Sequence, residues 1–293
     1  MVVSGDYTLK KEFIDATIKA IALREYVLKD LCTIESSSAQ TETYFRETNT
    51  DPTTVTTGGG ATVKVKGVPR FAPFVAGEVA WTKVSGQTNK YAGEGLIAYE
   101  DELMSNISII QRTLIRIARV PVRAVDEDIA ALMLASAGNV VTIAAGNEWD
   151  SATVANRTPI KDILDAIQLI RADNLNPLNG NGYLCLNGVD YTNLISNSQV
   201  VNNPTFKSGV LENGVVGELC GLKIKVTEAL ENGTPDKAYV VIAKEAMTWK
   251  EVVPLTTVTI VDEGKSKTIR AWELGQAQLV VPNGVARIDN TRK

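Results

Sequence analysis

The stretch from Tyr91 to Met104, YAGEGLIAYEDELM, combines two kinds of residue that can do chemistry. Gly93, Gly95 and Ala98 have the spacing of a dinucleotide-binding loop, in which backbone N–H groups hold a pyrophosphate. Such a loop follows a buried strand and opens a helix, whereas the residues before this one, SGQTNKY, are polar. No acidic residue lies about twenty positions on, where one would bind the ribose. The spacing therefore does not predict a nucleotide site, and we expect no cofactor.

Carboxylates crowd the same stretch. Glu94 lies between the glycines, and Glu100, Asp101 and Glu102 are consecutive. On a helix, consecutive side chains point about 100° apart, so these three cannot converge on one ion. Acidic residues at a helix start also interact favourably with the helix dipole. We expect an acidic helix entrance, and a carboxylate-dependent enzyme that uses Glu94, Glu100 or Glu102 is the catalytic alternative.

A second motif, Gly264-Lys265-Ser266 within DEGKSKT, has the form of the end of a phosphate-binding loop. That loop requires another glycine five positions earlier, where this sequence has Thr259. The residues that follow alternate like a strand and do not open a helix. We therefore predict a hairpin turn.

The sequence contains no histidine, which excludes Ser-His-Asp and Cys-His catalysis as well as histidine-based zinc sites. Carboxylate pairs, lysine bases and magnesium sites stay open. The three cysteines, Cys32, Cys185 and Cys220, are far apart and form no CxxC pair. This pattern favours free thiols in a reducing compartment over a disulfide framework. We expect no metal site and a protein that is not an enzyme.

Four arginines are spaced by four, three and four positions, which places them on one face of a helix: Arg112, Arg116, Arg119 and Arg123. Without an acidic neighbour on that face they would repel one another. One interpretation is a surface that meets another subunit or an anion. The other is a solvated face with local ion pairs, such as Arg123 with Glu127.

Composition limits the partners of the chain. Its 293 residues, 44% of them apolar, suffice for one large domain or two smaller ones. The net charge of −4 does not favour a nucleic-acid-binding protein, because such proteins are usually basic. No apolar run approaches the length of a membrane span, so we expect no membrane association.

Two helical patterns must position these residues. Apolar residues from Leu9 to Leu31 fall on one stripe of a helix, which another surface must cover. A longer helical pattern runs from Tyr99 to Ala137. Pro121 should kink or split it, and the acidic residues 126–128 could begin a second segment.

The rest of the sequence indicates an α+β fold. Residues 36–86 are rich in Thr, Ser, Gly and Pro, with short strands at TETYFRET and ATVKVKGV. They form either an extended hairpin that needs a partner surface or a flexible insertion. Beyond Gly138, a helix starts with Thr158 as N-cap and Pro159, and strands occur at GYLCLNG, GLKIKVTEAL, KAYVVIAKEAM, TTVTIVDEGKSKTIRAWELGQ and AQLVVPNGVARID.

This order of elements resembles the major capsid protein of tailed bacteriophages and related archaeal viruses, a fold shared with encapsulin shells. Glu102-Leu103 within YEDELMSN resembles the step into the family's long spine helix, with Glu100 where serine is frequent. Asp128-Ile-Ala followed by ASAG resembles the end of that helix.

Two further segments carry the resemblance. GELCGLKIKV, which starts at Gly217, is similar to a Gly-x-Pro-Val strand of the family, with Lys223 in place of the proline. LVVPNGVARI is similar to the closing strand, in which only Pro282 of a common Arg-Pro pair is present.

The resemblance implies a domain plan for the whole chain. Its parts are an N-terminal arm (1–35), an extended loop with flanking strands (36–95), a peripheral domain with the spine helix (96–150), an axial domain (151–249), peripheral strands (250–275) and a C-terminal axial strand (276–293). The turn after Asp262 would approach three-fold contacts between subunits.

The resemblance also implies a function. The chain would self-assemble into an icosahedral capsid of pentamers and hexamers that encloses double-stranded DNA, with portal, scaffold or cement proteins as further partners. It would assemble in the host cytoplasm and reside in the virion; an encapsulin-like nanocompartment is the alternative. The implied subunit contacts are Arg112, Arg116, Arg119, Arg123, Asp262, Glu263, Lys265, Glu100 and Glu102.

Overall fold

The computed structural model describes Ile18 and residues 25–47, 54–56, 62–64, 81–104, 109–201, 217–230, 236–262 and 264–293. The chain divides into two compact units. Unit 1 comprises residues 1–42, 86–132 and 248–278, and unit 2 comprises residues 43–85, 133–247 and 279–293.

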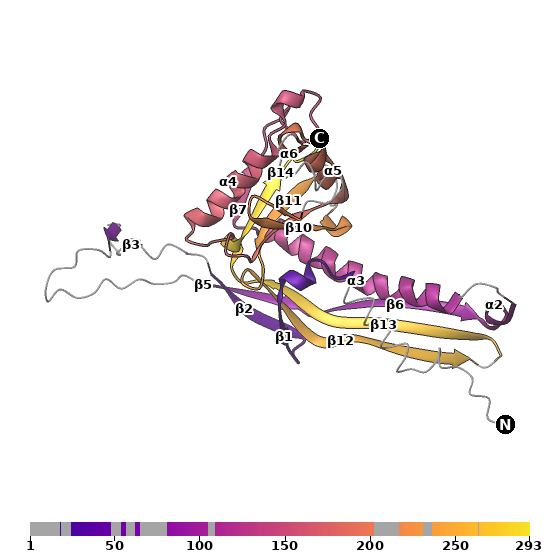
Figure 1. The fold of residues 1–293 in the computed structure, drawn as a ribbon. Helices are drawn as coiled ribbons and strands as arrows, with labels where there is room; N and C mark the ends of the chain where they lie inside the picture. The colour runs from indigo at the N-terminus through magenta and orange to yellow at the C-terminus, as the bar shows by residue number, and fades with distance from the viewer. Residues whose placement is uncertain are drawn as a thin grey trace, which may run out of the picture. The chain divides into compact units, whose positions relative to one another are not determined.

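Unit 1 is built on a four-stranded sheet (Figure 1). Its order is β1 (Thr33–Ser36), β12 (Met247–Asp262), β13 (Ser266–Leu279) and β6 (Asn89–Ala98). Strand β1 runs parallel to β12, and β6 runs antiparallel to β13, from Ala98 opposite Ser266 to Asn89 opposite Gly275. The long strands β12 and β13 thus carry the unit.

The turn between β12 and β13 is the one that the GKS motif occupies. Gly264 has a φ of +74°, a left-handed conformation that suits glycine, and the Lys265 N–H donates to the Asp262 carbonyl at 3.1 Å. The predicted hairpin turn is confirmed.

Helices α2 (Tyr99–Met104) and α3 (Ile109–Ser136) follow β6. Within unit 1, Leu114, Ile117 and Val122 of α3 are buried against Ile97 of β6 and against Leu255 and Ile269 of the long strands. Ile18, in the predicted arm helix, is fully buried in the same cluster, while most of that predicted helix lies outside the described residues. One face of the sheet is therefore covered by α3.

Helix α3 runs through Pro121 without a break, so the predicted split is wrong. Pro121 has no N–H to donate to the Ile117 carbonyl. That carbonyl faces β6, since a Cβ added to Gly93 would lie 3.2 Å from it. Pro121 and Val122 are buried, and their packing offsets the cost of the missing hydrogen bond, because tertiary contacts commonly outweigh helix propensity.

The two glycines of the opening motif have a packing role. A Cβ on Gly95 would lie 2.4 Å from Ile117 Cδ1 and 2.7 Å from Thr113 Cγ2 of α3, distances that packed side chains do not reach. Both glycines lie inside β6. Their spacing lets the strand approach the helix closely.

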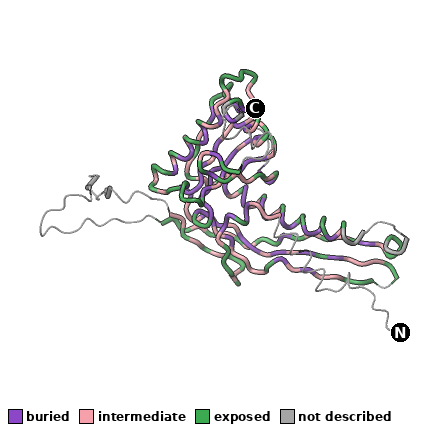
Figure 2. Tube along the Cα trace, viewed as in Figure 1, coloured by how far each residue is buried: buried purple, intermediate pink, exposed green. Residues whose placement is uncertain are grey.

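Unit 2 contains a six-stranded mixed sheet (Figure 1). In spatial order its strands are β7 (Asn139–Thr142), β14 (Val285–Asp289), β11 (Lys237–Ile242), β8 (Gly182–Leu186), β10 (Leu222–Val226) and β9 (Glu218–Leu219). The pairs β7–β14 and β8–β10 are parallel, and the other pairs are antiparallel. Figure 2 shows the buried residues of this unit gathered at the sheet.

Helices α4 (Pro159–Ala172), α5 (Gly188–Ser196) and α6 (Ser198–Val201) complete the described core of unit 2. Helix α4 packs on β7, β11 and β14 through Ile163, Ile167 and Ile170. Thr158 and Pro159 start α4 as predicted, although the Thr158 side chain makes no capping hydrogen bond. Short 3₁₀ helices are η2 (Lys29–Leu31), η3 (Val154–Asn156), η4 (Glu228–Leu230) and η5 (Pro282–Gly284).

Two small sheets lie in the region of the predicted hairpin. Strand β2 (Thr41–Glu47) pairs with β5 (Trp81–Gln87), and β3 (Thr54–Thr56) pairs with β4 (Thr62–Lys64). The strand predicted at TETYFRET is confirmed, while much of the second run, ATVKVKGV, lies outside the described residues.

Candidate functional site

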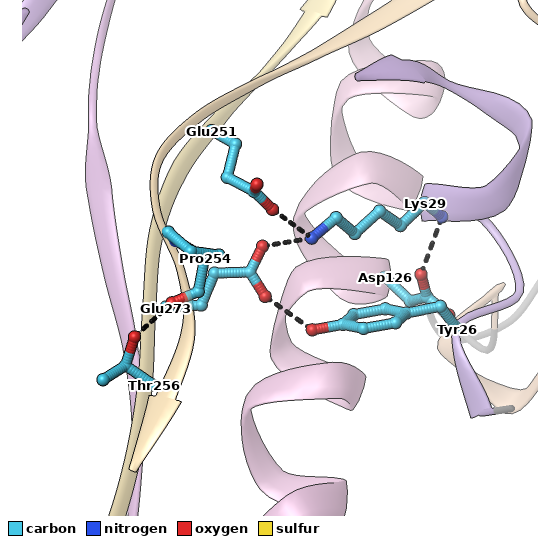
Figure 3. A network of polar contacts seen from close by, with 7 residues as sticks. All are labelled: Tyr26, Lys29, Asp126, Glu251, Pro254, Thr256 and Glu273. Carbon is cyan, nitrogen blue, oxygen red and sulfur yellow. Dashed lines mark hydrogen bonds and ion pairs between the residues drawn. The ribbon is translucent and has the colours of Figure 1, made fainter. Parts of the chain in front are cut away.

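A cluster of buried and half-buried polar side chains, here called the arm clamp, holds residues 25–31 to the rest of unit 1. It consists of Tyr26, Lys29, Asp126, Glu251 and Glu273 (Figure 3). The Lys29 ammonium makes an ion pair with Glu273 and another with Glu251 at 3.1 Å. Tyr26 Oη donates to the second Glu273 oxygen at 2.5 Å. Glu273 is fully buried and Lys29 is only 6% exposed, so each charge depends on the other.

Asp126 fastens the same segment from α3. Its carboxylate accepts the backbone N–H groups of Val27, Leu28 and Lys29 at 3.0, 3.2 and 3.0 Å. These donors precede or begin η2, so Asp126 satisfies the free N–H groups of a different helix. Burial raises the pKa of Asp126, while the three N–H donors and the Lys29 charge oppose that rise. The prediction that this acidic residue could begin a second helical segment is wrong.

Aromatic rings enclose the clamp. The Lys29 ammonium lies 4.7 Å from the Tyr26 ring centre and 5.3 Å from that of Trp249, distances at which a cation is attracted to a ring face. The Trp249 ring lies 5.9 Å from that of Tyr91, whose hydroxyl donates to Asp128 at 2.7 Å. Burial is the first cause of the raised pKa values of Tyr26 and Tyr91, so both donate as neutral phenols.

The exposed side of α3 carries the four arginines, here called the arginine face. Arg119 pairs with Glu25 at 2.8 Å, and Arg123 pairs with Glu127 at 2.7 Å. Arg112 and Arg116 are exposed and make no ion pair with any residue that the structure describes. The solvated alternative therefore holds for Arg123, whereas no described carboxylate compensates the charges of Arg112 and Arg116.

Two of the predicted acidic contacts, Glu100 and Asp262, lie at one end of unit 1. Tyr99 N–H, at the start of α2, donates to the Lys265 carbonyl in the β12–β13 turn at 3.1 Å. This bond places Glu100 and Asp101 beside the turn that carries Asp262. Asp262 pairs loosely with Lys265 at 3.5 Å, and both are exposed. We call Glu100, Asp101 and Asp262 the acidic tip; Glu263 and the Glu102 side chain lie outside the described residues.

Glu94 does not join the acidic tip. It lies on β6 opposite Arg270 of β13, and the two side chains pair at 2.7 Å with about half of each exposed. Among the residues described, no three acidic or cysteine side chains lie close enough together to hold a metal ion. None of the three cysteines forms a disulfide, and Cys32 and Cys185 are buried.

Unit 2 offers a further exposed surface on the β2–β5 pair. On one side, β2 is fastened to its own unit, since Arg46 Nε donates to the Leu279 carbonyl at 3.3 Å and Glu47 N–H donates to the Val280 carbonyl at 3.0 Å. Phe45 and Trp81 are 58% and 53% exposed. Strand alternation places Phe45 on the side opposite Arg46, so it faces away from these bonds.

A model of the phage capsid protein family matches residues 81–287, which include the arginine face, the acidic tip and most of both sheets. The chain belongs to the phage capsid protein family. A search of curated proteins found no match. Members of this family are structural proteins that form the capsids of tailed phages. Neither the enzyme nor the encapsulin alternative is therefore favoured.

Solved structures agree with the fold of this capsid protein. The capsid structure of the cyanophage P-SCSP1u has a TM-score of 0.64 at 13% identity, with 90% of this chain and 88% of the other covered. A structure from Mycobacterium phage Che8 has a TM-score of 0.63 at 15% identity, with 92% of each chain covered. A virus-like particle from Pyrococcus furiosus has a TM-score of 0.59 at 12% identity, with 94% and 98% covered.

The predicted α+β capsid fold is thus confirmed for this phage capsid protein. The place of such a protein is the virion, and none of its described helices is both long and apolar enough to cross a membrane. The arm clamp was not predicted from the sequence, because no spacing in the sequence connects Lys29 with Glu251 or Glu273.

Proposed function

We propose that this chain is the repeating subunit of an icosahedral phage head, built from pentamers and hexamers, that encloses double-stranded DNA. The observation that carries the proposal is the family match over residues 81–287. A shell of many identical copies needs repeated contacts between different patches of the same chain. The arginine face, the acidic tip and the exposed aromatic residues of β2 and β5 are patches of that kind.

The predicted domain plan assigns a task to each segment. Residues 1–35 would be an arm along neighbouring subunits, and residues 36–95 a loop that reaches over the next subunit. A two-stranded pair is marginal in water by itself, and the exposed side of β2–β5 would gain stability from a neighbouring surface. Residues 96–150 and 250–275 would form the peripheral domain, and residues 151–249 and 276–293 the axial domain around five-fold and six-fold axes.

The contacts within the shell would use the charged residues identified from the sequence. They are Arg112, Arg116, Arg119, Arg123, Asp262, Glu263, Lys265, Glu100 and Glu102. The net charge of −4 suits a shell that surrounds DNA without sequence-specific binding. Portal, scaffold and cement proteins are the further partners that we propose, with assembly in the host cytoplasm and no catalytic role.

Imaging of the purified protein tests the proposal. Electron microscopy of the expressed chain should show closed particles with five-fold vertices. A discrete monomer under every assembly condition would contradict it. Phe45→Ser should reduce particle yield about tenfold or more, because truncating an aromatic contact of an interface commonly removes much of its energy. Hydrogen exchange in strand β8, which should stay as in the wild type, is the control that the variant is folded.

A further inference from the structure

The arginine face carries more positive charge than the described residues of its chain neutralise. Arg119 and Arg123 have carboxylate partners in Glu25 and Glu127. Arg112 and Arg116 have none among the described residues, and they lie about 6 Å apart along α3, one helical turn. A pair of like charges at this spacing is destabilising unless another surface supplies negative charge.

The acidic tip has the opposite imbalance. Glu100 and Asp101 are exposed and make no ion pair with a described residue, whereas Asp262 is already paired with Lys265. The tip is held in place by the pairing of Ala98 with Ser266 and by the bond from Tyr99 N–H to the Lys265 carbonyl. Glu100 and Asp101 therefore carry two negative charges that no described residue pairs, and hydrogen bonds hold their backbone in place. These two charges are equal in number and opposite in sign to those of Arg112 and Arg116.

The surroundings of the arginines favour a protein partner. Ile115 is 36% exposed and Val120 is 51% exposed, and at 100° per residue they lie on the two flanks of the arginine stripe of α3. Arginine next to exposed apolar side chains is typical of protein interfaces. A nucleic acid would bring phosphate to the arginines but nothing apolar to cover Ile115 and Val120.

We propose that the arginine face of one copy docks on the acidic tip of a second copy, with Arg112 and Arg116 facing Glu100 and Asp101. This inference rests on the proposed function, because it needs copies that assemble. Every copy carries both patches in unit 1, so the contact is heterologous and can repeat from copy to copy. Exposed pairs of this kind are weak one by one and are screened by salt, so the contact chiefly sets the register between copies.

Charge exchange tests this pairing directly. Arg112→Glu/Arg116→Glu, and separately Glu100→Arg/Asp101→Arg, should each lower the yield of closed particles about tenfold or more, because like charges then meet across the contact. The quadruple variant that carries both exchanges restores the opposite charges and should return the yield to within about twofold of the wild type. Exchanging an exposed pair in unit 2, Lys161→Glu/Asp165→Lys, is the matched control and should leave the yield unchanged.

Three results would overturn the pairing. Both reversed variants could assemble like the wild type, or the quadruple variant could assemble no better than either of them. In the third, the Arg112→Glu/Arg116→Glu particles form normally but protect less DNA from nuclease, which would assign the face to phosphate. If a charge reversal impairs folding, as judged by thermal unfolding, the neutral variants Arg112→Gln/Arg116→Gln and Glu100→Gln/Asp101→Gln replace the reversed ones. A wild-type yield of closed particles from both neutral variants would then contradict the pairing. Failure of the proposed function itself is distinct, because the wild type would then form no particles.

Discussion

The two units of this capsid protein differ in what fills their interiors. Unit 2 has a continuous apolar core in which the strands β7, β11 and β14 are covered by α4. Unit 1 has an apolar cluster between α3 and its strands, and beside it lies the arm clamp with its buried Lys29, Asp126 and Glu273. Both units bury carboxylates, Asp190 and Asp236 in unit 2 among them, but of the described residues only Lys29 in unit 1 is a buried cation, and its ion pairs must form in one arrangement.

Because of this difference, the two units should respond differently to amino-acid substitution. Apolar burial is non-directional and tolerates small rearrangements. A buried ion pair adds little net stability, but removing one partner is costly because the other charge is stranded. The clamp thus fixes residues 25–31 to α3, β12 and β13, and these residues belong to the segment 1–35 that we propose as an arm along neighbouring subunits.

The largest effect should come from breaking the arm clamp. Lys29→Met leaves the fully buried Glu273 without a cation, and we expect a loss of about 3–5 kcal/mol from the local stability of unit 1. Hydrogen exchange followed by mass spectrometry would measure it as faster exchange in α3 and β13, with β8 of unit 2 unaffected.

A surface ion pair provides the control for Lys29. Lys161 pairs with Asp165 on α4 with its side chain 72% exposed, so Lys161→Met should cost no more than about 0.5 kcal/mol. Lys29→Met/Glu273→Gln should recover part of the loss, because the stranded charge is gone. Equal effects at positions 29 and 161 would remove the distinction between the two units.

A pH effect of intermediate size should distinguish unit 2. Burial, with a further contribution from Asp236, raises the pKa of Asp190 to about 6 from its ordinary 3.8, against the Thr291 hydroxyl and Arg292, which lower it. The folded chain then binds a proton more tightly than the unfolded chain. The contribution of Asp190 to stability is therefore greatest below about pH 4 and falls by up to about 3 kcal/mol as the pH rises to and through 6.

Asp190→Asn isolates this effect, because the amide cannot ionise. The difference in unfolding free energy between wild type and variant, measured by denaturant titration from pH 4 to 8, should shift in favour of the variant as the pH rises. Other buried carboxylates, such as Asp126 and Asp162, are common to both proteins and cancel in the comparison. A difference that does not change with pH would show that Asp190 ionises normally.

The smallest effect compares two buried tryptophans. Trp149 in unit 2 donates its ring N–H to Asp162 at 3.0 Å, whereas the ring N–H of Trp249 in unit 1 has no partner among the described residues. Replacement by phenylalanine removes a similar volume at each site. Trp149→Phe should lower the free energy of unfolding by about 1 kcal/mol more than Trp249→Phe. Only at position 149 does a buried acceptor, the Asp162 carboxylate, lose its donor. Thermal unfolding of both variants measures the difference, and a larger cost at Trp249 would contradict it.

Local patterns predicted much of the fold. The alternation in TTVTIVDEGKSKTIRAWELGQ gave both long strands of unit 1 and their turn, and Thr158-Pro159 gave the start of α4. The continuity of α3 was not predictable in this way, because the effect of Pro121 depends on β6 lying against the Ile117 carbonyl. The arginine stripe was visible from its spacing. The ion pair of Arg119 was not visible, because its partner Glu25 lies 94 positions away in the sequence.

The amino-acid sequence by itself determined the order of elements and the short motifs that resemble a capsid protein, the absence of histidine chemistry, and the arginine stripe of α3. Residue types, their order and their short-range periodicity are properties of the sequence alone. Only the tertiary structure decided that Lys29 is buried, that Asp126 serves another helix, and that Gly93 and Gly95 allow a close packing contact. Each of these depends on groups up to 244 positions apart, and such distances are set by how the strands and helices pack.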